Sequence, residues 1–264
     1  MVLLSWNVAG RQGRLDEQAE VVCALGAALI CLQEVTPATA SGWAARLEGA
    51  GYHVAMAELP LRRESSRPLA VLTAAQSDLT AETVGGVPWA ERVLAVRLPA
   101  LGGLEVVNVH SPVSPKPDLA KVRTHEAVFR HLAARANHPC LVCGDLNTPR
   151  REHADGTVWT FARTRAGRLR PDRGERWDVA ETALIRGLEP YGYRDAFRAV
   201  HGNELKEVSW EWPRGGGYRL DHLIVSRGIE VADCRYGHGW RRELGLSDHS
   251  PLLAEIVVAR RSQS

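Results

Sequence analysis

The stretch CLVCGDLNTP, residues 140–149, joins an apolar run to a polar turn. The apolar part, Cys140–Cys143, is short and continuous, which predicts a strand buried on both faces. In the polar part, Asp145 and Asn147 favour a turn because their side chains bond to nearby backbone groups. The stretch therefore predicts a buried strand that delivers a carboxylate and an amide to the loop at its end.

The same arrangement, an apolar run next to a polar side chain, recurs along the chain. Polar residues at the ends of predicted strands are Asn7, Glu34, His110, Asp145, Asn147, Asp221, Asp248 and His249. In layered α/β folds, functional sites gather where strand ends meet loops. We therefore expect these side chains to meet at one place in the fold although they are far apart in sequence.

Apolar periodicity predicts the other elements. Predicted strands are Val2–Val8, Leu29–Leu32, Tyr52–Met56, Leu69–Thr73, Leu79–Val84, Arg92–Leu98, Leu104–His110, Cys140–Cys143, Val208–Trp212, Arg219–Val225, Glu230–Tyr236 and Leu252–Val258. Predicted helices are Leu15–Leu25, Gly42–Leu47, Leu119–Ala136 and Asp178–Leu188. Strands occur both as neighbours and separated by helices, which favours a mixed α/β sandwich over a pure βαβ array. No linker or repeat divides the chain, so we predict one domain over residues 1–259 and a frayed tail over 260–264.

Composition narrows the class of protein. Of the 264 residues, 45% are hydrophobic and 24% are charged, as in ordinary globular chains. The net charge of +2 is small for a nucleic-acid coat, so any phosphate-binding charge must be local. The five cysteines are odd in number and lie among apolar residues, which favours reduced thiols, and Cys140 and Cys143 lack the second pair that a zinc site needs. With no leader-like segment and no long apolar run, the sequence predicts a cytoplasmic protein that does not cross a membrane.

Several of the polar residues suit metal-assisted cleavage of a phosphate ester. Mg²⁺ prefers oxygen ligands, and Glu34 and Asn7 can supply them. The Asp145 carboxylate can take a proton from an attacking water, and Asn147 can orient that water or a phosphate oxygen.

A second group completes this chemistry. A histidine held by a carboxylate, His249 with Asp221, can donate to a phosphoryl oxygen in the transition state. Each polar residue taken singly also fits an ordinary turn, a plain loop or a core histidine. The whole set, in this order, favours the chemical interpretation.

Six stretches resemble the endonuclease/exonuclease/phosphatase superfamily, which includes exonuclease III and deoxyribonuclease I. They are SWNVAG (5–10), LQEV (32–35), NVHSP (108–112), GDLNTP (144–149), RLDHL (219–223) and SDHSP (247–251). The resemblance implies a deoxyribonuclease I-like α/β fold, a four-layer αββα sandwich with two mixed, mostly antiparallel sheets. It also implies a Mg²⁺ cofactor, for which Mn²⁺ can substitute.

The resemblance further implies a role for each matching residue. Implied metal-holding residues are Asn7, Glu34 and Asp248, and implied catalytic residues are Asp145, Asn147, Asp221 and His249. The implied reaction is direct in-line attack by water, since no Ser or Cys in the motifs is placed like an activated nucleophile.

The stretch SWEW (209–212) before YRLDH resembles the exonuclease III branch, which includes abasic-site endonucleases. In that branch aromatic residues here line the pocket for a baseless sugar, and Trp210, Trp212 and Tyr218 match them; packing in the core is the alternative. The chain departs from this branch at His110, where abasic endonucleases usually have Tyr, and after Glu34, where a Lys is often found. A His at the first of these positions resembles the deoxyribonuclease I and phospholipase-type branches, in which it can act as a general acid.

The most basic segment, residues 163–176, contains six arginines and begins soon after Asn147. A basic loop beside a phosphate site suits contact with a nucleic-acid backbone, although such runs also occur as plain solvated loops. Arg67 and Arg123 are further candidates for substrate binding, and Lys121 and His125, near Arg123 on the same predicted helix, are also expected to face substrate. The expected partner is nucleic acid, specifically duplex DNA, bound by a monomer.

Three functions stay open. The first is a Mg²⁺-dependent phosphoesterase acting on DNA as an abasic endonuclease, a 3′ exonuclease or a 3′ phosphatase. The second is a phosphodiesterase or phosphatase of small-molecule or phospholipid esters, which His110 and the small net charge favour. The third is a non-catalytic binding module on the same scaffold, which the complete set of polar positions disfavours. We predict the first.

Overall fold

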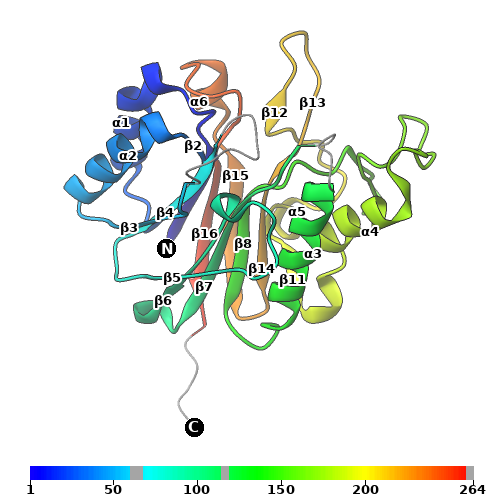
Figure 1. Ribbon diagram of the computed structural model, residues 1–264, viewed down its shortest axis with the longest axis horizontal. Helices are drawn as coiled ribbons and strands as arrows, with labels where there is room; N and C mark the ends of the chain where they lie inside the picture. The colour runs from blue at the N-terminus through cyan, green and yellow to red at the C-terminus, as the bar shows by residue number, and fades with distance from the viewer. Residues whose placement is uncertain (60–67, 114–118, 260–264) are drawn as a thin grey trace.

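Two six-stranded sheets face each other in the computed structural model, which describes residues 1–59, 68–113 and 119–259 (Figure 1). The first sheet has the order β15 (Ile229–Tyr236), β16 (Leu252–Val258), β1 (Val2–Asn7), β2 (Leu29–Val35), β4 (Ala70–Ala75) and β3 (His53–Met56). The second has the order β11 (Tyr193–Asp195), β14 (Asp221–Ser226), β8 (Cys140–Asp145), β7 (Leu104–His110), β6 (Val93–Leu98) and β5 (Thr80–Glu82). Two short hairpins stand apart from these sheets: β9 (Arg151–Glu152) with β10 (Val158–Trp159), and β12 (Trp210–Glu211) with β13 (Gly217–Tyr218).

Most helices lie outside the pair of sheets, whereas Ala196 and Phe197 of the fifth helix join the cluster between them. The helices are α1 (Leu15–Leu25), α2 (Pro37–Gly49), α3 (Ala120–Ala133), α4 (Gly174–Ile185), α5 (Ala196–His201) and α6 (His238–Arg242). Across the ranges that the structure describes, no helix has both the length and the apolar character needed to cross a lipid bilayer.

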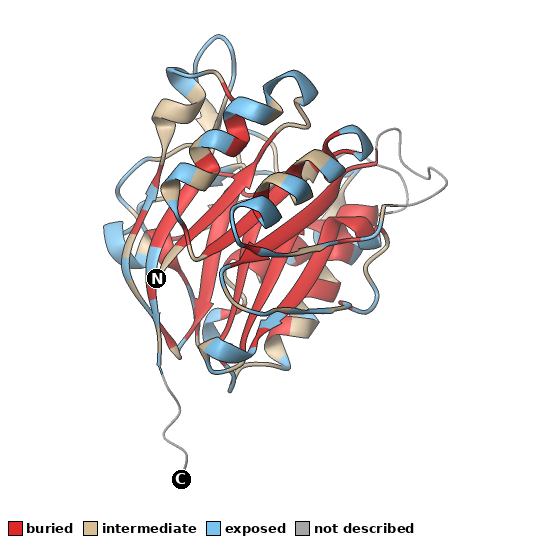
Figure 2. Cartoon of the chain, turned by 90° about the vertical axis from the view of Figure 1, so that its left-hand side faces the viewer, coloured by how far each residue is buried: buried red, intermediate tan, exposed pale blue. Residues whose placement is uncertain are grey.

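Three hydrophobic clusters bind the layers together. One lies between the sheets, where Cys31 of β2 and Cys143 of β8 are both fully buried. A second packs the first sheet against α1 and α2, with Trp43 as its largest helical side chain. The third packs the second sheet against α3 and α4 through residues such as Val128 and Leu184. Figure 2 shows the buried strands between partly exposed helices, so the predicted four-layer sandwich is confirmed.

Strand direction places the polar residues. Only β1–β2 and β7–β8 are parallel among the described strand pairs, so the sheets are mixed and mostly antiparallel, as predicted. The carboxyl ends of a parallel pair lie at the same edge of a sheet. Asp145 at the end of β8 is therefore level with His110 at the end of β7, and it also pairs with Asp221 at the start of antiparallel β14.

A buried amide connects the two sheets directly beneath this edge. Asn108 of β7 donates to the carbonyl oxygens of Leu32 and Leu72 at 3.2 Å and 2.9 Å, and accepts a bond of 2.8 Å from Gln33 Nε2. Gln33 adjoins Glu34, and Asn108 precedes His110 by two residues. A buried amide is stable only when its polar atoms are paired, so this cluster fixes how the sheets lie relative to each other at the edge that carries the polar residues.

Predicted and observed elements differ mainly in length. Leu15–Leu25 and Leu104–His110 have the predicted bounds, whereas α2 begins at Pro37 rather than Gly42 because Thr36 and Thr39 form a capping box. The short helices α5 and α6 were not predicted. With six and five residues they are too short to show a helical apolar period.

Candidate active site

Asp145 lies at the centre of the polar cluster. Its carboxylate is buried, accepts a bond of 2.9 Å from the Asn147 backbone and a bond of 3.0 Å from Asn7 Nδ2. Gly144 makes this position possible, because a Cβ there would lie 2.0 Å from the carbonyl oxygen of Val109. The close approach of β7 and β8 therefore depends on the glycine of the Gly-Asp-x-Asn motif.

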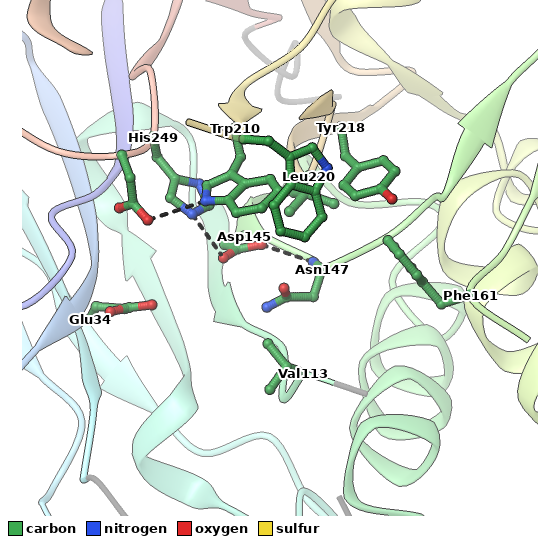
Figure 3. A pocket seen from close by; sticks show the side chains of 11 residues that line it. Glu34, Val113, Asp145, Asn147, Phe161, Trp210, Tyr218, Leu220 and His249 are labelled. Atoms are coloured by element: carbon green, nitrogen blue, oxygen red, sulfur yellow. Dashed lines mark hydrogen bonds and ion pairs between the residues drawn. The ribbon is translucent and has the colours of Figure 1, made fainter. Parts of the chain in front are cut away.

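Glu34 reaches the same place from the first sheet. The pairing of β2 with β4 shifts register between Leu32 and Val35, and Glu34 within this bulge has φ +60°. Bulges re-aim side chains, and a left-handed non-glycine residue is uncommon and tends to occur at functional sites. The result is that Glu34 points toward Asp145 across the gap between the sheets (Figure 3).

These side chains fit a divalent cation. Ligand atoms of Glu34, His110 and Asp145 all lie within 4.8 Å of one another. Burial raises the pKa of Asp145 to about 7, and the charges of Asp221 and Glu34 act in the same direction while His249 opposes them. A cation between the carboxylates would remove this like-charge repulsion, so the donor set suits a divalent metal.

Asn7 connects the two carboxylates. Its Nδ2 donates to Glu34 Oε1 at 3.2 Å and to Asp145 Oδ2 at 3.0 Å, while its Oδ1 accepts from the Ala9 backbone at 2.9 Å. It is thus the amide nitrogen, not the oxygen, that faces the acids. Asn7 lies where the sequence places it, and its role as an oxygen ligand stays a prediction.

Asp221 and His249 form the predicted pair. His249 Nδ1 lies 2.8 Å from Asp221 Oδ2. Its Nε2 lies 3.9 Å from Asp145 Oδ2 (Figure 3). Burial alone lowers the pKa of His249, but the Asp221 carboxylate overrides this effect and raises the pKa to about 10. A buried imidazolium therefore faces Asp145 in the group formed by Glu34, His110 and Asp145 at neutral pH.

His110 has a different environment. It is buried between Glu34, whose Oε1 lies 3.5 Å from Nε2, and Arg92, whose Nη1 lies 3.2 Å from Nδ1. Burial lowers the pKa of His110 well below its ordinary value, and the charges of Arg92 and His249 lower it further. His110 is therefore neutral at neutral pH. Arg92 ends the one-turn helix η2 (Ala90–Arg92), and no sequence signal indicated its place beside the site.

An aromatic pocket of about 320 Å³ opens onto these groups. The predicted residues Trp210, Trp212 and Tyr218 line it from the β12–β13 hairpin, together with Val113, Phe161 and Leu220. Trp212 is 49% exposed, which excludes the alternative that it packs in the core. The hairpin is held at the site because the Trp210 ring nitrogen donates to Asp248 Oδ2 at 3.1 Å and Trp210 forms a β-bridge with His249.

The loop that carries Asn147 is anchored by a buried ion pair. Lys121 Nζ lies 2.7 Å from Glu181 Oε1 and donates to the Asn147 carbonyl at 2.6 Å. Glu181 also accepts bonds from Thr148, Phe161 and Trp177. Asn147 itself has φ +52°, a conformation that the surroundings must impose. The expectation that Lys121 and its neighbour His125 face substrate is corrected, because both side chains are fully buried.

Replacing Lys121 with methionine is expected to lower the free energy of unfolding by about 3–5 kcal/mol, because Glu181 would stay buried without its cation. The double variant Lys121→Met/Glu181→Gln removes both charges and should recover much of that loss. Urea unfolding of the two variants and of Glu181→Gln measures the coupling energy. If Lys121→Met and Lys121→Met/Glu181→Gln were equally stable, a structural role for the ion pair would be contradicted.

The remaining predicted residues do not belong to the group formed by Glu34, His110 and Asp145, although Asp248 lines the same pocket. Asp248 is exposed and is engaged by Trp210, so its role as a metal ligand stays a prediction. Arg123 is exposed on α3 and does not line the pocket, and Arg67 lies outside the described residues. In the segment 163–176, ion pairs engage four of the six arginines: Arg163 with Asp178, Arg170 and Arg173 with Asp172, and Arg176 with Glu126.

Comparison with known proteins agrees with this fold. A family model described as Endonuclease/Exonuclease/phosphatase family matches residues 4–249, whereas curated proteins give no match. An AP endonuclease from Archaeoglobus fulgidus is similar with a TM-score of 0.74 and 21% identity, over 97% of this chain and 98% of that one. A 3′ phosphatase from Neisseria, solved with a product DNA hairpin, has a TM-score of 0.69 and 21% identity over 97% and 98%. The catalytic domain of Xenopus laevis APE2 has a TM-score of 0.67 and 20% identity over 99% and 94%.

Proposed function

The chain belongs to the endonuclease/exonuclease/phosphatase family, and from this premise we propose that it is a divalent-metal-dependent hydrolase that cleaves a phosphate ester in DNA. One observation carries the proposal: Glu34, Asp145 and His249, from three distant parts of the chain, line one pocket with aromatic walls. The candidate reactions are abasic-site cleavage, 3′ exonuclease action and removal of a 3′ phosphate.

Mg²⁺ is the proposed cation, with Mn²⁺ as a substitute. Glu34 and Asp145 would hold it, with His110 and Asn7 beside them. When bound, the cation neutralises the charge that develops on the phosphate as its ester bond breaks. Asp248, on the same loop as His249, would become a further ligand only if its carboxylate gave up the hydrogen bond from the Trp210 ring nitrogen.

The chain supplies the proton chemistry. The Asp145 carboxylate is proposed to take the proton of the attacking water, and the backbone bond from Asn147 orients it. His249, kept protonated by Asp221, would donate to a phosphoryl oxygen and stabilise the charge there. A neutral His110 suits ligation or hydrogen bonding better than proton donation, so we assign the acid role to His249.

The aromatic pocket supports a sugar-phosphate substrate. Tyr218 and Phe161 offer flat apolar surfaces on the side of Asp145 opposite to Glu34, and Trp210 offers another beside His249 (Figure 3). Such surfaces suit the apolar face of a sugar or a base flipped out of its stack. A small-molecule or phospholipid ester is the second candidate, and the observation that favours it is the presence of His110 in place of Tyr.

A substrate panel tests the proposal. We expect the purified protein with Mg²⁺ to cleave abasic, 3′-phosphate or plain duplex DNA, and to lose this activity in excess chelator until Mg²⁺ or Mn²⁺ is restored. RNA, a phospholipid and soluble phosphoesters complete the panel. Turnover of the phospholipid or the soluble esters without any DNA cleavage would select the second candidate, and full activity in chelator would exclude a metal mechanism. Duplex preference, a monomeric state and a cytoplasmic location stay predictions.

A further inference from the structure

A second cavity, of about 480 Å³, adjoins the aromatic pocket, and Tyr218 lines both. One wall is the loop that follows the Asn147 turn, from Pro149 to Ala154. The other wall combines α5 and the segment after it with the base of the β12–β13 hairpin. We call this cavity the basal groove. Because Tyr218 lines both cavities, a ligand that extends past this residue from the pocket would reach the groove.

The floor of the basal groove is charged but balanced. Glu152 accepts two bonds from Arg219, at 2.8 Å and 2.6 Å, and two from Arg198, at 3.2 Å and 2.8 Å. Asp195 pairs with the other side of Arg219 at 2.7 Å. Two arginines thus face two carboxylates, and the Arg219 side chain is almost fully buried. This network makes the floor rigid and leaves little net charge on it.

The rim carries the unbalanced charge. Arg150, Arg151 and Lys206 line the groove, and within the described part of the chain none of them has an ion-pair partner. The Arg151 guanidinium lies 5.5 Å from the Trp159 ring centroid, and Arg150 donates to the Arg163 carbonyl at 3.1 Å, so both have defined positions. The rim carboxylate of Glu207 is already paired with His238 at 3.1 Å. Three cations therefore stand on the rim beside a single rim carboxylate, which leaves the rim with an excess of positive charge.

This distribution differs from that of the segment 163–176. Its arginines are mostly engaged by acids of α3 and α4 or by Asp172. The basal groove, by contrast, holds uncompensated cations next to the pocket that contains Asp145. Free cations beside a phosphate site attract a polyanion, whereas paired ones do not.

We propose that the basal groove binds the sugar-phosphate backbone of the DNA strand that continues from the ester in the pocket, with Arg150, Arg151 and Lys206 on successive phosphates. This inference rests on the proposed function and extends it, because it assigns a polymeric substrate. A small phosphoester ends within the pocket and makes no use of cations beyond Tyr218. Contacts of this kind set the position of a strand without reading its sequence.

The test removes two exposed cations, in the double variant Arg151→Ala/Lys206→Ala. We expect kcat/KM on a duplex oligonucleotide to fall about tenfold, through KM rather than kcat. With fewer phosphate contacts, binding releases fewer counterions from the DNA and is therefore weaker. The slope of log(kcat/KM) against log salt should become shallower by about two. Arg151→Lys/Lys206→Arg keeps the charge and should restore both values. Arg227→Ala, an exposed arginine in the turn after β14, at the end away from Asp221, is the matched control.

The outcomes separate the two proposals. If the double alanine variant still cleaves DNA with the salt slope and KM of the wild type, the proposed role of the basal groove is overturned and the proposed function stands. An equal loss in Arg227→Ala would also overturn it, since the effect would then reflect overall charge. If the wild type hydrolyses a soluble diester but no DNA, the proposed function fails, and the groove fails with it. The proposal is supported if the alanine variant has a higher KM and a shallower salt slope. It further requires that the charge-keeping variant restores both values and that Arg227→Ala changes neither.

Discussion

Replacing Asp145 with asparagine is expected to lower kcat by about 10³-fold or more, with the fold intact. Asp145 stands between Glu34 and His249, so its carboxylate is the group best placed both to hold a cation and to take a proton from water. The amide has the same shape but carries no negative charge and cannot accept the proton. Single-turnover cleavage of DNA at saturating Mg²⁺ measures the loss.

Stability distinguishes this chemical role from a structural one. The pKa of Asp145 in the folded protein, about 7, lies above the value of an unfolded carboxyl, so ionisation of this group opposes folding at pH values above the unfolded pKa. The penalty is complete above pH 7, and Asp145→Asn removes it, although the lost bond from Asn7 offsets part of the gain. In chelator at mildly alkaline pH, the free energy of unfolding should therefore stay the same or rise by about 1 kcal/mol. A clear fall in stability would mean that the loss of activity has a structural cause.

The strands and loops of the site were predictable because each motif contains its own local signal. Gly144 and Asp145 follow a continuous apolar run, and the end of that run is where a strand meets a loop. The order of six such stretches indicated the family and with it the four-layer fold. The aromatic candidates Trp210, Trp212 and Tyr218 were recognised in the same way, from their place beside the Asp221 motif.

Other features of the site depend on long-range packing, which no local pattern reports. Arg92 approaches His110 only because a one-turn helix precedes β6. Glu181 has the spacing of any polar residue on a helix, yet it is buried against Lys121 and holds the Asn147 loop. The arginine-rich segment 163–176 had the stronger sequence signal for DNA contact. Pairing with acids, visible only in three dimensions, moved that assignment to the basal groove.

Asp221→Asn is expected to lower kcat by about 10²–10³-fold, the typical effect of weakening one donor to a phosphoryl or carbonyl oxygen. The backbone at this position is held by bonds from its own N–H to Ser209 Oγ and from the Tyr236 hydroxyl to its carbonyl, and neither depends on the carboxylate. The substitution therefore removes the charge beside His249 while the strand stays in place.

The pH profile gives this prediction its sharpest test. Asp221 raises the pKa of His249 to about 10, so in the wild type the donating imidazolium persists through neutral pH and is lost only as pH rises through the alkaline range. Without that carboxylate, burial is opposed only by the weaker effects of Asp145 and Asp248, so the pKa of His249 falls and the alkaline limb of the rate profile should move toward lower pH. Asp16→Asn, which removes a charge from exposed α1, should leave the limb where it is. If the limb in Asp221→Asn coincides with that of the wild type, His249 is not the group whose proton the reaction needs.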